Sequence, residues 1–294
     1  MPHMGGTFET DIVVEAAGPG RYRAELSHDW DLIALPQGGI VVSFALRAAA
    51  DAVTSASPGP PDPAEAVQTL RTCTAVFAGP VAAGELEVDV HVLRRGRSAT
   101  QVVSTVRNRG ETSGTTVMAV FGSRRRGPEF VDIAPPAVPR PDDCPSYRDR
   151  PPEGVAEPER WPFWNRIEGR PALGHAPWEA FEPERSDIAT WLRFDDPPLT
   201  ATGALDPLGV LTLADRMPGS VDERTGRQGD RWFAPSADLT VHFFVPARTT
   251  WLLAHDRARW AGDGWASAET TLWGEDGTLV AYATQMMLFT YPPG

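Results

Sequence analysis

Two parts of the chain repeat the same order of hydrophobic and polar patterns. Each part begins with β-like alternation, continues with an apolar stretch at helical spacing, and ends with four β-like segments separated by short turns. The apolar stretches at 38–54 and 206–217 predict buried helices. The predicted strands are 7–14, 22–26, 66–77, 86–94, 99–108 and 115–121 in the first part, and 188–194, 236–245, 251–259, 265–273 and 279–289 in the second. This repetition predicts an internal duplication.

Two landmarks give nearly the same spacing between the two parts. Pro80 corresponds to Pro246, an offset of 166 residues, and Gly39 corresponds to Asp206, an offset of 167. Each part has a helix and an antiparallel sheet whose apolar faces must be buried against each other. We therefore expect an α+β fold, a double hotdog with two antiparallel sheets each wrapped around a long central helix.

Proline separates the two parts. It recurs so often between 128 and 198 that neither a long helix nor a central strand is expected through most of that region. The predicted domains are an N-terminal repeat at 1–125, a proline-rich connector at 126–185, and a C-terminal repeat at 186–294 that carries the active site. The connector aromatics Trp161, Phe163 and Trp164 are expected to dock near the start of the second repeat.

Composition and charge narrow the function classes. The 294 residues are 41% hydrophobic and 22% charged, as in a globular protein. A net charge of −12 disfavours binding to nucleic acid, because such binding depends on clustered basic residues. No apolar run approaches the roughly 20 residues that cross a bilayer, and the N-terminus lacks the pattern of a signal peptide. We expect a protein without membrane or nucleic-acid partners.

Metal and cofactor signatures are missing from the sequence. Cys73 and Cys144 form no CxxC pair, and the six histidines have no zinc-ligand spacing. The GxSxG, GxGxxG and P-loop motifs are also absent. The sequence therefore predicts no metal and no cofactor, and two unpaired cysteines fit a reducing cytoplasm.

An ordered series of short motifs resembles the acyl-CoA thioesterase II (TesB-like) family. These motifs are the Pro-Gln-Gly-Gly run at 36–39 that opens a helix, Phe-Ala-Gly-Pro-Val at 77–81, the run 92–98, Asp-Leu-Thr-Val-His-Phe at 238–243, 276–280 and Ala-Thr-Gln at 283–285. The chain resembles a divergent, actinobacterial-type member, because Leu239 stands where the best-known type has His, and Phe243-Phe244 replaces a Phe-His pair. The resemblance implies two hotdog repeats in one chain and hydrolysis of acyl thioesters.

The family's water-holding residues correspond by position to Asp215, Ser236 and Gln285. Asp215 lies in an apolar helical pattern, where burial would raise the pKa of its carboxyl. It could instead lie on an exposed helix edge and pair with Arg216 or another charge. Gln285 lies between apolar residues, which fits either water positioning or a hydrogen-bonded core amide.

Ser236 belongs to an alternating polar run. Ser236, Asp238, Thr240 and His242 are predicted to share one face of a strand, which could line a site or face solvent. Thr240 is therefore the alternative to Ser236.

The 167-residue offset predicts a single site. It pairs Asp215 with Ala48, Thr240 with Cys73, and Gln285 with Met118, so the first repeat lacks the polar set. We expect the first repeat to contribute packing, an acyl tunnel and the backbone N–H groups of Gly38 and Gly39 for substrate binding.

The resulting hypothesis is an enzyme of lipid metabolism that hydrolyses fatty or related acyl-CoA thioesters with an Asp-oriented water. Its substrate partner is an acyl-CoA or acyl-carrier thioester, and a homo-oligomer is expected. One alternative is a non-hydrolytic acyl-thioester-binding or biosynthetic hotdog protein. A second is a hydratase or dehydratase, whose usual central-helix histidine is missing here.

Overall fold

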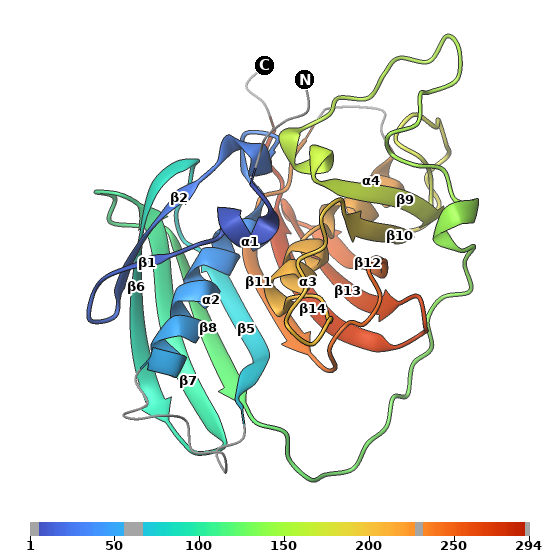
Figure 1. Cartoon of the computed structure of the whole chain (residues 1–294). Coiled ribbons are helices and arrows are strands. Elements are labelled where there is room, and N and C mark those ends of the chain that lie inside the picture. Colours follow the sequence, from blue (N-terminus) through green and yellow to red (C-terminus); the bar gives the residue numbers. More distant parts are fainter. Residues whose placement is uncertain (1–5, 56–66, 227–231, 292–294) are drawn as a thin grey trace.

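A single 12-stranded antiparallel sheet forms the body of the molecule. The computed structural model describes residues 6–55, 67–226 and 232–291. The order of the strands in the sheet is β1-β2-β6-β7-β8-β5-β11-β14-β13-β12-β10-β9 (Figure 1). The strands of the first half are β1 (Glu15–Gly18), β2 (Arg21–Leu26), β5 (Thr69–Phe77), β6 (Gly84–Arg95), β7 (Ala99–Asn108) and β8 (Thr115–Gly122). Those of the second half are β9 (Ile167–Leu173), β10 (Asp187–Phe194), β11 (Ser236–Phe243), β12 (Leu252–Gly262), β13 (Trp265–Gly274) and β14 (Leu279–Leu288).

The sheet order reads the same from both edges. Each strand of the first half has a counterpart at the mirrored place in the second, from β1 and β9 at the edges to β5 and β11 in the middle. β5 and β11 pair antiparallel, and Thr74, opposite Thr240, shares a 3.0 Å hydroxyl hydrogen bond with it. The prediction of two separate sheets is therefore wrong, because the backbone groups of these two strands satisfy each other and join the halves.

Helix α2 (Gly38–Ser55) covers the first half, as predicted. It packs against β6, β7 and β8, and the Ser104 hydroxyl donates to the Ala45 carbonyl at 2.8 Å. By length and composition alone this helix could cross a membrane, which the sequence analysis did not anticipate. More than half of it is buried inside the fold, as in the core helix of a globular protein.

The second central helix is short and interrupted. Helix α3 (Pro207–Ala214) ends three residues before its predicted end, and α4 (Pro218–Thr225) follows in a new direction. Pro218 has no N–H to donate to the carbonyl of Ala214, so a continuous helix cannot form there. The prediction of a long central helix thus holds for the first half only. α3 lies beside α2 on the same side of the sheet (Figure 1).

The N-terminal segment differs from its prediction. Residues 7–14 were expected to form a strand, but Phe8–Asp11 is a short helix (α1) capped by the Thr7 side chain, which accepts from the Thr10 N–H at 3.3 Å. Phe8 and Ile12 are buried whereas Thr10 between them is exposed, which is helical rather than alternating spacing. A two-stranded hairpin of β3 (Asp31–Leu32) and β4 (Leu35–Pro36) leads into α2.

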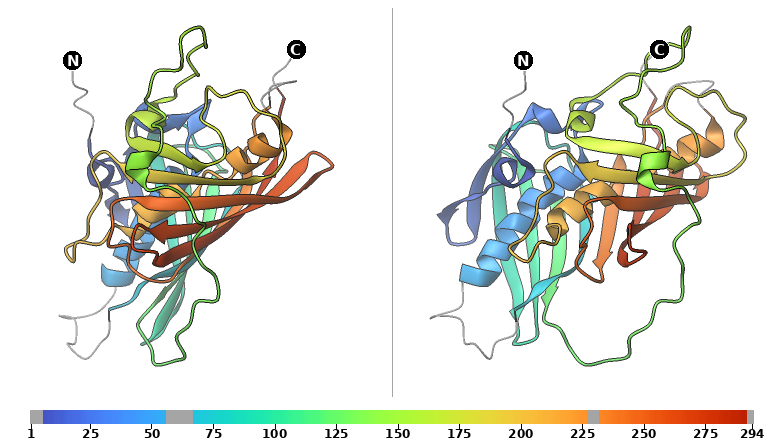
Figure 2. Two further views of the ribbon diagram at one scale, coloured as in Figure 1. Left: turned by 90° about the vertical axis from the view of Figure 1, so that its right-hand side faces the viewer. Right: turned by 45° about the vertical axis from the view of Figure 1, so that its right-hand side comes forward.

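The connector contains one strand of the sheet. Most of the segment passes along the outside of the molecule (Figure 2), with single turns η2 (Pro141–Asp143) and η3 (Pro162–Asn165). β9 was not predicted, and its position at the sheet edge explains why it tolerates Pro171. Phe163 is buried against Trp30 at 6.4 Å between ring centroids, so this connector aromatic docks on the first half and not near the start of the second repeat as predicted. The domain boundaries remain predictions, and Ala66, the first residue of one predicted strand, lies outside the described residues.

Candidate active site

Asp215 lies at the break between α3 and α4, not within a helix. Its backbone (φ −86°, ψ 68°) forms the centre of a tight turn in which the Arg216 N–H donates to the Ala214 carbonyl at 3.0 Å. The turn projects the Asp215 carboxylate toward the first half of the molecule. Oδ2 accepts from the backbone N–H of Gly39 in the first half at 2.8 Å, and Oδ1 accepts from Nε2 of Gln285 in the second half at 2.7 Å.

Gln285 joins Asp215 to Ser236. The Gln285 amide on β14 is 2% exposed and donates to both the Asp215 carboxylate and the Ser236 hydroxyl on β11. Its Oε1 has no hydrogen-bond partner within the described part of the chain. The structure therefore brings together the three residues that the family resemblance selected.

A β-bulge directs Ser236 into this cluster. Ser236 pairs with Met287 and Asp238 pairs with Met286, so Ala237 is the extra residue. The bulge reverses the alternation, and Ser236 faces the same side as buried Met287 and Gln285. The predicted single polar face of Ser236, Asp238, Thr240 and His242 is therefore wrong at its first position.

Thr240 is not part of the cluster. Its neighbours Leu239 and Val241 are fully buried toward the helices, which places Thr240 on the opposite face of the sheet. Its hydroxyl bonds to Thr74 across the junction of the two halves. The alternative role for Thr240 therefore has no support from its position.

The N-terminus of α2 closes the site from the other half. The Gln37 side chain donates to the backbone carbonyls of Asp215 at 2.7 Å and Thr212 at 3.1 Å, and its Oε1 accepts from the Ile40 N–H at 3.0 Å. The sequence analysis did not assign a role to Gln37, although its place immediately before Gly38 and Gly39 was a usable signal. Gln37 fixes the Asp215 turn against the first half.

The two glycines allow the close approach. A Cβ on Gly38 would lie 2.7 Å from Oδ2 of Asp215, and one on Gly39 would lie 2.9 Å from the Cα of Thr212. Gly39 donates its N–H to Asp215, so in this structure it positions the carboxylate. The predicted role of these glycines in binding substrate remains a prediction.

Burial controls the ionisation of Asp215. The side chain is nearly inaccessible, and desolvation raises the pKa of its carboxyl to about 6. The hydrogen bonds from Gly39 and Gln285 act in the opposite direction by stabilising the carboxylate. Asp215 has no ion pair within the described residues, and Arg216 pairs instead with buried Asp256 at 2.8 Å. The alternative of an exposed Asp215 paired with Arg216 is therefore wrong.

The equivalent positions of the first half are apolar. Thr74 and Thr240, which face each other at the junction, are 166 residues apart, and the same offset relates the bulge at 70–72 to that at 236–238. It pairs Ser236 with Leu70 and Gln285 with Ala119, both buried. The predicted offset of 167 was one residue too long for the strands. It matched Thr240 with Cys73 and Gln285 with Met118, and each of these matches lies on the opposite face of the sheet from the true equivalent. The cluster is present in one copy among the described residues.

The chemistry of the cluster follows from its groups. A carboxylate with a pKa near neutrality can accept a proton from water, and an adjacent amide and hydroxyl can orient that water. The described residues contain no group of three or more His, Cys, Asp or Glu side chains that could hold a metal ion.

Two protein-family models match most of the chain. Residues 26–122 match the family model of the acyl-CoA thioesterase N-terminal domain, and residues 141–289 match that of the C-terminal domain. A search of curated protein sequences finds no significant match.

Solved structures establish the fold. A protein of unknown function with a hot dog fold from Alicyclobacillus acidocaldarius superposes with a TM-score of 0.77 at 23% identity, over 97% of this chain and 98% of that chain. An acyl-CoA thioesterase II from Mycobacterium marinum superposes with a TM-score of 0.72 at 22% identity, over 98% of this chain and 100% of that chain. The large antiparallel sheet and its helices are thus a hotdog-type α+β fold.

Proposed function

Because this chain belongs to the acyl-CoA thioesterase family, we propose that it hydrolyses fatty or related acyl-CoA thioesters through a water molecule oriented by Asp215. Family membership makes the protein a thioester hydrolase with an acyl-CoA substrate. The Asp-oriented water, the acyl group and the cellular setting are our proposals. We place the enzyme in lipid metabolism in the cytoplasm and expect it to work as a homo-oligomer without a cofactor.

One observation carries the proposal. Asp215 is a buried carboxylate without a cationic partner in the described structure, held between the Gly39 N–H and the Gln285 amide. Burying a carboxylate without a counter-ion is costly, so a chain retains one where its proton affinity is used. A structural role alone could be filled by a neutral side chain of similar shape.

The proposed reaction has two stages. Asp215 accepts a proton from water while the water oxygen attacks the thioester carbonyl carbon, with Gln285 and Ser236 orienting the water. The N-terminal end of α2 lies beside the carboxylate, and its dipole stabilises the negative charge that develops on the carbonyl oxygen. The tetrahedral intermediate then breaks its C–S bond, the CoA sulfur leaves and takes up the proton from Asp215, and the free acid departs.

Release of free CoA from short, medium and long acyl-CoAs tests the proposal. We expect turnover by the wild type and a loss of at least about a hundredfold in kcat for Asp215→Asn, the usual range for a positioned base. Asp263→Asn is the matched control, because Asp263 is exposed in a turn with φ 52°, a conformation that Asn adopts readily.

The alternatives predict other results. An inert wild type whose Tm still rises with a long acyl-CoA would identify a non-hydrolytic binding protein. Hydration of an enoyl-CoA without CoA release would identify a hydratase, although in the described residues the Asp215 carboxylate is hydrogen-bonded by Gly39 and Gln285 and by no histidine.

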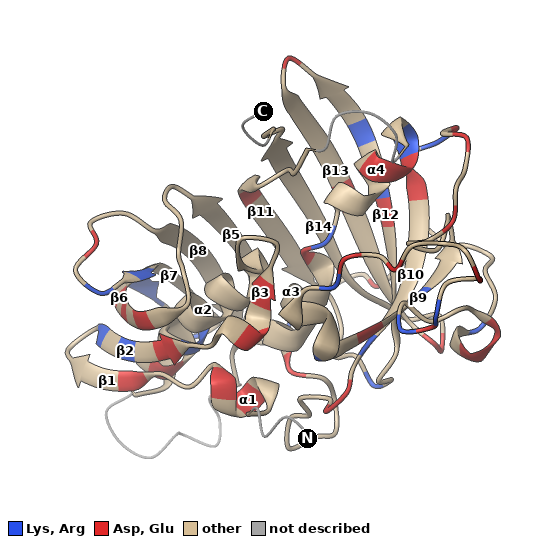
Figure 3. Cartoon of the chain, turned by 90° about the horizontal axis from the view of Figure 1, so that it is seen from above, with Lys and Arg blue, Asp and Glu red and all other residues tan. Residues whose placement is uncertain are grey.

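The charge distribution fits a small-molecule substrate. Figure 3 shows acidic residues on both halves, including α1, β3 and α4, with basic residues dispersed among them. A surface of this kind lacks the continuous basic stripe that tracks a phosphate backbone. We propose no nucleic-acid partner.

A further inference from the structure

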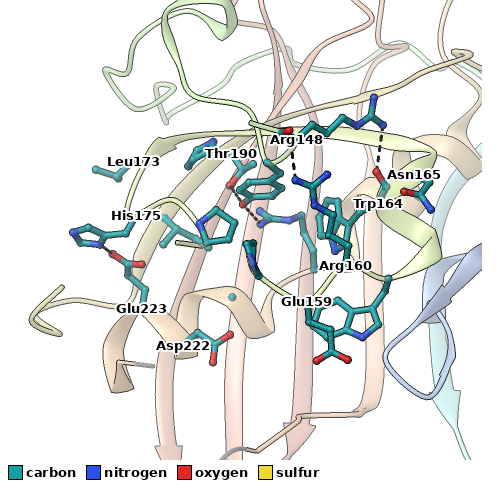
Figure 4. A pocket seen from close by; sticks show the side chains of 18 residues that line it. Arg148, Glu159, Arg160, Trp164, Asn165, Leu173, His175, Thr190, Asp222 and Glu223 are labelled. Atoms are coloured by element: carbon teal, nitrogen blue, oxygen red, sulfur yellow. Dashed lines mark hydrogen bonds and ion pairs between the residues drawn. The ribbon is translucent and has the colours of Figure 1, made fainter. Parts of the chain in front are cut away.

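A cavity lies next to the Asp215 cluster but outside it, and Arg216, the residue after Asp215, is part of its lining. It has a volume of about 350 Å³ and is enclosed by β9, β10, α4 and the connector around η3 (Figure 4). None of the residues that line it is Asp215, Ser236, Gln285, Gly38 or Gly39. The volume is near the lower end of the usual range for small-molecule sites.

Aromatic rings and prolines form the walls. Tyr147 and Trp164 meet edge to face with centroids 5.3 Å apart, and Trp161 stands beside them without a ring partner in the described residues. Pro158, Pro171 and Pro177 add flat apolar surface. Such walls favour a planar ring, which can stack or meet the rings edge to face.

Polar groups gather at one place in the cavity. Arg216 donates to the Tyr147 hydroxyl at 3.3 Å, and this hydroxyl lies 3.4 Å from that of Thr190. The Arg216 side chain is 11% exposed, and its Nε has no hydrogen-bond partner in the described structure although it is buried. An alkyl chain bound here would leave these groups facing hydrocarbon, which is costly.

The arginines of the cavity are not all neutralised. Arg148 makes two hydrogen bonds to Asp195 at 2.8 and 2.9 Å, and Arg216 pairs with Asp256. Arg160 instead donates to the backbone carbonyl of Arg148 at 3.5 Å and has no carboxylate partner within the described residues. Figure 4 shows its side chain extending between Arg148 and the body of the cavity.

The acidic side chains lie elsewhere around the cavity. Glu223 is engaged by His175 at 2.5 Å, and Asp222 also has a partner. Glu159 is exposed at the rim, and Figure 4 shows it and Asp222 on the side away from Arg148. The charge available to a ligand is therefore positive at the Arg160 end.

We propose that this cavity is a binding site for a small aromatic carboxylate. The ring lies against Trp161 and the proline walls, and the carboxylate accepts from Arg160 and from the polar group around Arg216. An Arg guanidinium binds a carboxylate by two parallel N–H bonds, which also fixes the plane of the ring. The site is independent of the hydrolytic reaction and would remain if the proposed function failed.

Calorimetric titration of the full chain with 2-naphthoate tests this site. We expect binding by the wild type and by Arg150→Gln, an exposed connector arginine outside the cavity, and at least about tenfold weaker binding by Arg160→Gln, as for loss of a charged hydrogen bond. Trp161→Leu keeps apolar bulk without the aromatic ring and is also expected to weaken binding. Far-UV circular dichroism and Tm establish that each variant folds.

Two further probes test the ligand class. 2-Naphthamide has the ring without the charge, and decanoate has the charge on an alkyl chain; both are expected to bind at least about tenfold more weakly than 2-naphthoate. The proposal is overturned if 2-naphthoate does not bind at millimolar concentration or if Arg160→Gln binds it as well as Arg150→Gln does. It is also overturned if 2-naphthamide or decanoate binds the wild type as tightly as 2-naphthoate. Preferential binding of adenosine 3′,5′-bisphosphate would overturn it in favour of a nucleotide site.

Discussion

The two halves of the sheet share a backbone plan and differ in what they place beneath it. Both carry a bulge at the matching position of their central strand, after Leu70 in the first half and after Ser236 in the second. The inward residues around the bulge are Leu70 and Ala119 in one half, and Ser236 and Gln285 in the other. The same frame therefore supports either a plain core or a polar cluster, and the chemistry depends on a few side chains.

The central helices show the same difference. α2 runs unbroken for 18 residues, whereas α3 ends after eight at the turn that presents Asp215. The two helices meet at the site, because the Gly39 N–H at the N-terminus of α2 donates to the Asp215 carboxylate that follows α3. The cluster thus takes a helix N-terminus from the first half and a carboxylate from the second.

Among changes that test the difference between the halves, the largest effect is expected from giving the second half a residue of the first. Gln285→Ala reproduces Ala119 and removes the amide that contacts both Asp215 and Ser236. We expect kcat for CoA release to fall about a hundredfold, the scale for loss of one positioned donor. Thr284→Ala, on the same strand but the opposite face, should retain near wild-type activity. Equal losses in the two variants would contradict the difference between the halves.

Lowering the pH should reduce activity by protonating Asp215, which belongs to the second half. Because burial raises the pKa of Asp215 to about 6, the carboxylate that accepts the proton becomes scarce below that pH. We expect kcat/KM to fall about tenfold for each unit of pH below about 6 and to level off above it. Initial-rate measurements of kcat/KM over a range of pH, with circular dichroism to confirm folding at each pH, provide the check. A flat profile from pH 5 to 8 would contradict the role of Asp215.

Contact between the halves can be tested at Gly38. In Gly38→Ala the new methyl group would lie 2.7 Å from the Asp215 carboxylate and 3.0 Å from the Phe77 ring. We expect about a tenfold loss of kcat and a decrease of about 1 to 3 kcal/mol in the free energy of unfolding, as for overpacking. Gly127→Ala is the control, because nothing lies within 4 Å of its added methyl. Unchanged kcat in Gly38→Ala would show that Asp215 needs no close contact with α2.

The smallest effect is expected at the bulge. Ser236→Ala removes one of the groups that orient the water, and we expect about a threefold to tenfold loss of kcat. Thr240→Ala, on the outer face of the same strand, should change Tm slightly through loss of its bond to Thr74 and leave kcat intact. A loss of kcat in Thr240→Ala with kcat unchanged in Ser236→Ala would assign the water-orienting role to Thr240 instead of Ser236.

Much of the fold could be predicted from the sequence. The four-strand meanders and α2 follow from alternation and helical spacing, which are local properties. β9 could not be found in this way, because an edge strand tolerates proline and Pro171 argued against it. The single sheet could not be found either, since pairing of β5 with β11 joins residues far apart in the chain.

The site was predicted in part. Asp215, Ser236 and Gln285 came from a family resemblance, and the structure brings them together. The choice between Ser236 and Thr240 depended on a bulge that alternation alone does not reveal. Gln37 was missed because its two acceptors are backbone carbonyls 175 and 178 residues away.

Because the two halves joined at β5 and β11 belong to one chain, their contact should not depend on protein concentration. If the two halves were separate molecules, the contact of Gly39 with Asp215 would obey mass action and disappear at low concentration. The connector makes that encounter intramolecular, with an effective concentration that does not change when the protein is diluted. Turnover per molecule should therefore stay constant as the enzyme becomes scarce, so long as the site draws only on this one chain.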